Sequence, residues 1–99
     1  MVAVNARTIR FEASCLTYRD ACLIARRAGR GATGRCVHLH LDATVQTSTA
    51  ALARLVLLRR ELLRRGRDLW IVGLRGRARA LYDISRLDRL LPLLPAGHA

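Results

Sequence analysis

The chain contains no lysine and has few aromatic residues, prolines and glycines. All eighteen basic residues are arginine, against seven acidic residues, which gives a formal net charge of +11. With seven glycines, two prolines and 52% hydrophobic residues, the chain does not belong to the disordered or fibrous classes. Aromatic residues make up only 4%, so the core must consist mainly of aliphatic side chains, as in helices packed on a sheet. At this length we expect one domain over residues 1–99.

Long apolar runs are also absent. No stretch approaches the roughly 20 apolar residues that span a bilayer, and the N-terminus has no charged region followed by an apolar run. The three cysteines, Cys15, Cys22 and Cys36, are odd in number and lack CxxC spacing. This pattern argues against both a disulfide framework and a zinc site. We therefore expect reduced thiols, no membrane span and a cytoplasmic location.

The excess of arginine has two interpretations. A positive field of this size attracts nucleic acids and anionic membranes. However, the arginines are spread over several expected elements, and no aromatic residues are interleaved with them for base stacking. A coding bias that turns every exposed basic position into arginine explains the same composition. We favour the second interpretation, so nucleic acid is not the partner that we expect.

The hydrophobic pattern predicts two strands followed by alternating helices and strands. Strands separated by helices need crossover connections and therefore lie parallel, whereas the first two strands, joined by a turn at residues 5–7, would form a hairpin. The sequence thus predicts an α/β fold with a mixed β-sheet of about four strands and three to four helices. The expected strands cover residues 2–4, 8–12, 36–41 and 68–73, and the expected helices cover residues 17–28, 49–65 and 75–85.

The apolar positions of the helices predict their buried faces. Arg59 falls inside the apolar arc of the second helix, so its stem must run along apolar surface or the arc must face a partner. The leucine-rich segment 87–94 either packs back on the sheet or leads to a homodimer. The expected inner residues are Ala21, Leu23, Ile24 and Ala28 in the first helix, Leu52, Leu55, Val56, Leu58, Leu62 and Leu63 in the second, and Ala78, Leu81, Tyr82 and Ile84 in the third.

Two histidines, His38 and His40, share one face of the strand at residues 36–41. Such a pair could bind a metal, but no third ligand is evident near them. We therefore expect two histidines on the second face of the sheet. No metal or cofactor site is predicted.

The segment from Arg35 onward carries several features in a fixed order. An apolar strand is followed by a polar loop with small hydroxyl residues, a leucine-rich helix that ends at Gly66, an apolar strand that ends at Gly73, and a last helix with the leucine–aspartate step Leu87-Asp88. This order resembles STAS domains, the fold of anti-sigma factor antagonists. The resemblance covers about two thirds of the chain.

The resemblance implies a non-enzymatic module that docks through the loop before its long helix and the start of that helix, about residues 42–52. In the family this loop typically reads aspartate, serine or threonine, serine or glycine, then glycine, and the third position is the serine that a partner kinase phosphorylates. By position, Ser48 replaces the aspartate, Thr49 matches the hydroxyl residue, Ala50 stands at the phosphoserine and Ala51 replaces the glycine. The usual switch is therefore absent unless Thr49 or Ser48 accepts the phosphate. The expected partner-binding residues are Thr47, Ser48, Thr49, Ala50 and Ala51.

Ser48 or Thr47 is also a natural N-cap, and Thr49 is an ordinary residue at a helix start. Two kinds of partner fit the resemblance. The first is an anti-sigma factor or a related ATP-binding, kinase-like regulator. The second is the ATPase of a phospholipid ABC transporter, whose STAS subunit has a threonine followed by two small residues in this loop. An enzyme is not expected, because the chain has no nucleophile elbow, Gly-rich phosphate loop or HExxH pattern.

Overall fold

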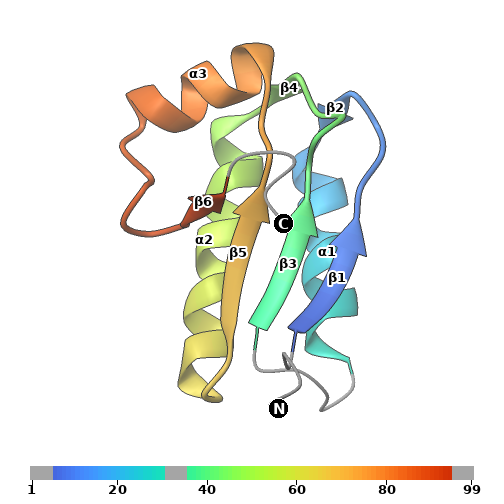
Figure 1. Ribbon diagram of the computed structural model, residues 1–99, viewed down its shortest axis with the longest axis vertical. Coiled ribbons are helices and arrows are strands. Elements are labelled where there is room, and N and C mark those ends of the chain that lie inside the picture. The colour runs from blue at the N-terminus through green and yellow to red at the C-terminus, as the bar shows by residue number, and fades with distance from the viewer. Residues whose placement is uncertain (1–5, 31–35, 95–99) are drawn as a thin grey trace, which may run out of the picture.

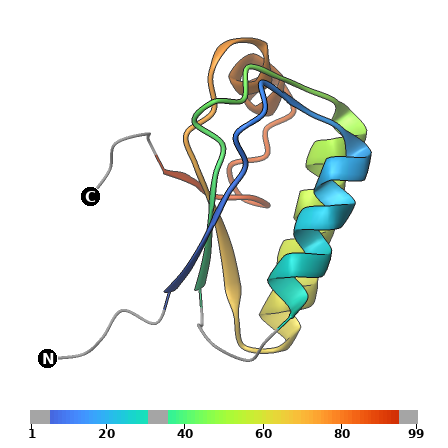
Figure 2. The ribbon, with the colours of Figure 1, turned by 90° about the vertical axis from the view of Figure 1, so that its right-hand side faces the viewer.

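A computed structural model describes residues 6–30 and 36–94. Its main sheet has the strand order β1-β3-β5-β6, and every pairing in it is parallel. Helices α1 and α2 lie side by side on one face of this sheet, and α3 lies at one end (Figures 1 and 2). The elements are β1 (Ala6–Arg10), β2 (Cys15–Leu16), α1 (Tyr18–Gly29), β3 (Cys36–His40), β4 (Gln46–Thr47), α2 (Thr49–Arg64), β5 (Asp68–Val72), α3 (Gly76–Ile84) and β6 (Leu93–Leu94).

The core lies between the sheet and the two long helices. Parallel pairing aligns Ile9 with Leu39 and Leu39 with Ile71, so these side chains form one buried row beneath the helices. Helix α1 contributes mainly alanines to this core, and these small side chains suit its close packing against α2. The α/β fold and its main helices and strands, predicted from the periodicities, are confirmed. None of the helices in the described part of the chain combines the length and the hydropathy needed to cross a membrane.

The start of the chain differs from the prediction. Ala6 and Arg7, expected in a turn, belong to β1, because the parallel ladder with β3 already begins at Ala6 and Cys36. All strand pairings among the described residues are parallel. The hairpin partner expected at residues 2–4, which would have made the sheet mixed, lies outside the described residues.

Three leucine and isoleucine side chains expected in the core are exposed. Leu23 is 50% exposed, Leu63 46% and Ile84 79%. In α1 the buried stripe runs through Ala21, Ile24, Ala25 and Ala28, with Leu23 to one side. Helix α3 sits at the end of the sheet and buries only Ala78 and Tyr82, so Ile84 has nothing to pack against.

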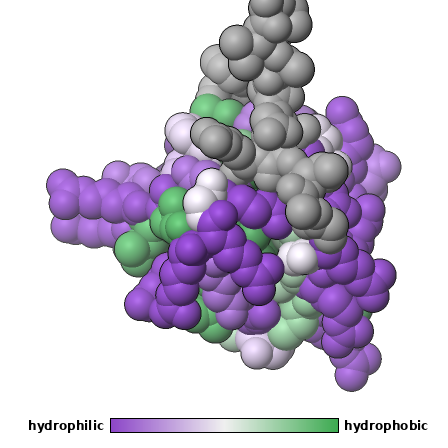
Figure 3. All heavy atoms as spheres, turned by 90° about the horizontal axis from the view of Figure 1, so that it is seen from below, coloured by the Kyte–Doolittle hydropathy of each residue, from purple (hydrophilic) through white to green (hydrophobic). Residues whose placement is uncertain are grey.

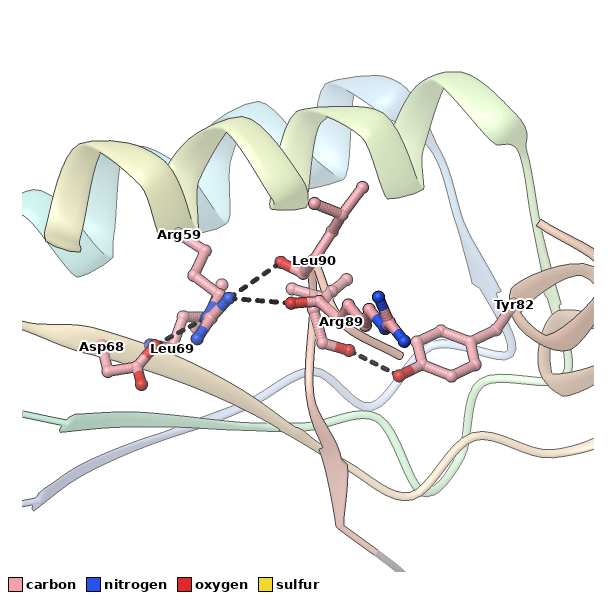
Figure 4. A network of polar contacts seen from close by, with 7 residues as sticks. Arg59, Asp68, Leu69, Tyr82, Arg89 and Leu90 are labelled. Atoms are coloured by element: carbon pink, nitrogen blue, oxygen red, sulfur yellow. Dashed lines mark hydrogen bonds and ion pairs between the residues drawn. The ribbon is translucent and has the colours of Figure 1, made fainter. Parts of the chain in front are cut away.

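The leucine-rich segment after α3 packs back on the molecule. Leu91 is fully buried, and β6 pairs with β5 through Leu93 and Leu94. The Tyr82 hydroxyl donates a hydrogen bond to the Leu91 carbonyl oxygen (Figure 4). Burial raises the pKa of this phenol, with a smaller contribution from Asp88, so it remains a neutral donor.

Arg59 ties three parts of the chain together (Figure 4). Its Nε donates to Asp68 Oδ1 at 2.7 Å, and its NH1 lies 3.3 Å from the carbonyl oxygens of Arg89 and Leu90. The two charged side chains are only 18% and 28% exposed. An ion pair with the start of β5 therefore explains why an arginine occupies the apolar arc of α2.

Replacing Arg59 with methionine is expected to lower the free energy of unfolding by about 1–3 kcal/mol. Methionine keeps most of the apolar stem but leaves the Asp68 carboxylate without its cation. Urea unfolding measures the change. The matched control is Arg60→Met, because Arg60 is exposed on the same helix and should change stability by no more than about 0.5 kcal/mol. Equal losses in both variants would contradict the role given to the Arg59–Asp68 pair.

The hydrophilic side chains extend in several directions when the molecule is seen from below (Figure 3). Hydrophobic areas lie between them rather than forming one continuous face. On this side of the molecule the hydrophilic residues are thus dispersed.

Candidate functional site

The carboxyl ends of β1, β3 and β5 lie together at one end of the sheet (Figure 1). In parallel α/β sheets, loops at this end commonly carry functional residues. Here the segment between β3 and α2, residues 41–48, lies between the β1–α1 connection and the start of α3. This loop is the one that the sequence predicted as a docking site.

On one side, hydrogen bonds fix the loop to residues 13–16. The buried Thr44 donates its hydroxyl to the Ala13 carbonyl oxygen at 3.1 Å, and Thr47 donates to the Leu16 carbonyl oxygen at 2.9 Å. The backbone N–H groups of residues 45 and 46 both reach the Ser14 carbonyl oxygen. These contacts continue as the two-stranded pairing of β2 with β4.

On the other side, α3 begins directly against the loop. The Arg75 N–H donates to the Thr44 carbonyl oxygen at 3.2 Å, and the Ala78 N–H donates to the Val45 carbonyl oxygen at 2.9 Å. Gly76 has a φ of 57°, and a Cβ there would lie 3.3 Å from the Val45 Cβ. The loop is therefore held from both sides by hydrogen bonds.

Gly76→Ala is expected to destabilise the domain more than Gly66→Ala. Both glycines have positive φ, 57° and 74°, so both variants carry a backbone cost of about 1–2 kcal/mol. A Cβ at Gly66 meets nothing within 4 Å, whereas at Gly76 it presses on Val45. We expect an additional loss of about 1 kcal/mol for Gly76→Ala in urea unfolding. Identical losses of unfolding free energy in the two variants would show that the start of α3 does not pack tightly against the loop.

The five predicted docking residues meet at the start of α2. Ser48 is the N-cap, and its Oγ accepts a hydrogen bond from the Ala51 N–H at 3.0 Å, which confirms one of the two N-caps proposed from the sequence. Thr49 and Ala50 are exposed in the first turn, and Thr47 is half-buried. Ala51 is fully buried, so its side chain cannot contact a partner. We call the accessible surface formed by Val45, Thr47, Ser48, Thr49 and Ala50 the α2 entrance.

Sequence reasoning did not single out Val45, which is 37% exposed beside the helix start. Its only signal was a β-branched apolar residue in an otherwise polar loop. The first turn of α2 contains no acidic residue. The partial positive charge of the helix N-terminus is therefore not offset by a side chain of that turn.

The histidines lie as expected on the face of β3 opposite the core, and both are half-buried. His40 Nδ1 lies 3.8 Å from Asp42 Oδ1. Among residues 6–30 and 36–94, no three His, Cys, Asp or Glu side chains gather as a metal site would require. Burial, with a smaller effect of Asp68, raises the pKa of the Cys36 thiol, so this cysteine is a weak nucleophile at neutral pH.

Comparison with known proteins adds a structural likeness. No family model matches the sequence, and no curated protein matches it. The fold is similar to part of the murine solute carrier 26 family member A9, an anion transporter solved in its inward-facing state, with a TM-score of 0.73 over 99% of this chain. The chain has a STAS-like fold. Sequence identity is 13%, and the match covers 17% of the transporter chain, so the likeness concerns the fold alone.

Proposed function

We propose that this chain is a non-enzymatic STAS-type module that binds an anti-sigma factor or a related ATP-binding, kinase-like regulator through the α2 entrance. The observation that carries the proposal is an exposed helix start on a loop that is hydrogen-bonded on both sides. A surface that is already ordered loses little conformational entropy when a partner docks. Binding would sequester the partner and release the transcription factor that it holds.

The α2 entrance offers three kinds of contact to a protein. Val45 provides an exposed apolar side chain, and Ala50 is small enough to let a partner backbone approach the helix closely. The N–H groups of the first turn favour acidic or carbonyl groups of the partner. The net charge of +11 would speed association with an acidic surface without itself specifying the partner.

Thr49 is the better candidate for a phosphorylation switch. Ser48 uses its hydroxyl oxygen to cap α2, whereas Thr49 is exposed and its hydroxyl has no hydrogen bond within the described residues. A phosphate on Thr49 would lie near the positive end of the helix, so the free chain would tolerate it. Its charge and bulk would nevertheless obstruct a partner docked at the same place.

A second candidate function is an accessory subunit that binds the ATPase of a phospholipid ABC transporter. Ala50 places a methyl group where a switchable antagonist has its phosphoserine. Together with the buried Ala51, this leaves a small, uncharged helix start at the centre of the entrance. A surface of this kind suits a permanent subunit contact that needs no phosphorylation.

Affinity capture from the native cells, followed by binding assays with the purified proteins, separates these functions. Wild-type chain and a Thr49→Glu variant serve as parallel baits. Recovery of a small ATP-binding regulator by the wild-type bait alone supports the antagonist function, and recovery of an ABC ATPase supports the second candidate. If the chain is retained on DNA at physiological salt and no captured protein differs between the two baits, both proposed functions are contradicted.

A further inference from the structure

A cavity of about 380 Å³ lies between the outer edge of β1 and helix α1, in a region that the docking proposal does not use. Its volume falls within the range of small-molecule sites. Ile9 and Phe11 contribute apolar side chains from the sheet edge, and Leu23 and Ile24 contribute them from α1. The cavity thus has largely apolar walls on two sides.

Topology explains why the cavity is open. Within the described residues, β1 pairs only with β3, so its other side faces solvent at the edge of the sheet (Figure 1). The lining residues of α1, Asp20, Leu23, Ile24 and Arg27, stand at positions i, i+3, i+4 and i+7 and therefore form one stripe along the helix. Leu23, which is 50% exposed, belongs to this stripe. Leu23 lines the wall of a cavity, which explains why it is exposed although its spacing along α1 predicted a core position.

Positive charge surrounds the cavity. Arg10, Arg27 and Arg30 line it, and none of them forms an ion pair within residues 6–30 and 36–94. The one carboxylate in the lining, Asp20, is engaged in the helix cap, where its Oδ2 accepts hydrogen bonds from the Thr17 N–H and hydroxyl. Arg7 donates to the Arg30 carbonyl oxygen at 2.8 Å, which brings another guanidinium to the C-terminal end of α1.

We infer that this cavity binds a single-chain amphiphilic anion, that is, an apolar body carrying a carboxylate or phosphate head group. The body would lie against Leu23, Ile24 and Phe11. The head group would pair with the arginines, whose planar donor groups match both carboxylate and phosphate. Such a ligand removes apolar surface from water and offsets the repulsion among like charges.

Other classes of ligand match either the apolar walls or the arginines of this cavity, but not both. An uncharged apolar molecule leaves the guanidinium groups without a counter-charge, and a small inorganic anion leaves the apolar walls in contact with water. A second copy of this chain would bring another net charge of +11 against the same positive rim. The combination of apolar walls and arginines therefore favours one ligand class.

Amide NMR titration of the full chain tests the proposal with sodium octanoate and octyl phosphate as probes, both below their micelle-forming concentrations. We expect saturable shifts confined to the amides near residues 9–11 and 20–30. The dissociation constant of octanoate should be at least about tenfold lower than those of acetate and of 1-octanol. Octyl phosphate distinguishes a phosphate head group from a carboxylate, and binding of either probe supports the inference.

Matched variants determine whether the cavity itself is responsible. Leu23→Glu and Arg27→Glu should each weaken octanoate binding at least about tenfold. The controls are Leu63→Glu, at a leucine of similar exposure on α2, and Arg64→Glu, at another arginine in the last turn of a helix. Both controls should bind like the wild type. Non-saturable shifts spread over the arginine-bearing surface, or equal losses in the control variants, would overturn the inference.

Discussion

Leu55→Asp is expected to unfold the domain at 25 °C, whereas Leu57→Asp should leave it folded. Leu55 is fully buried in the middle of α2, inside the core formed with the sheet. An aspartate there must either bury an unpaired charge or remain protonated without a hydrogen-bond partner. Either state costs several kcal/mol, and we expect a loss above about 4 kcal/mol. A loss of this size removes most or all of the stability of a small domain at the lower end of the ordinary range, about 5 kcal/mol.

Leu57 is the matched control because it lies two residues further along the same helix and is 46% exposed. Aspartate has the same low helix propensity at both positions, so the propensity cost cancels in the comparison. Far-UV circular dichroism and urea unfolding measure both variants. Similar stability of the two variants would show that α2 does not pack on the sheet through the face that contains Leu55.

Thr49→Glu is expected to weaken partner binding by about two orders of magnitude or more, which is the second largest effect. The exposed side chain lies at the centre of the α2 entrance, where added bulk and negative charge imitate a phosphate. The same change should leave stability unchanged or raise it by about 0.3–1 kcal/mol, because a carboxylate in the first turn interacts favourably with the helix dipole. Lost binding without lost stability separates a docking residue from a structural one.

The sequence predicted those elements whose signals are local. Helix α2 has a capping serine at Ser48, a periodic apolar face and a closing glycine at Gly66, and its bounds matched to within one residue. The alternation in β3 likewise placed His38 and His40 on one face and Val37 and Leu39 on the other. In both elements neighbouring residues alone determine the pattern.

The features that were missed depend on contacts between distant parts of the chain. Arg59 pairs with Asp68, and its guanidinium also donates to two carbonyl groups about thirty residues away. The exposure of Leu23 depends on β1 being the edge strand of the sheet, and the burial of Ala51 depends on the packing of the first turn of α2 into the core. The pairing of β2 with β4, two residues each, is too short to leave a periodic signal.

The most direct test of the account is the affinity of the captured partner for three purified chains, measured by isothermal titration calorimetry. Alongside wild type and Thr49→Glu, a Thr8→Glu variant places the same charge change at another exposed threonine, on β1. The account predicts that Thr8→Glu binds within about threefold of wild type, a difference below about 0.7 kcal/mol, while Thr49→Glu shows no measurable heat of binding. Equal affinity of Thr49→Glu and wild type would contradict docking at the start of α2.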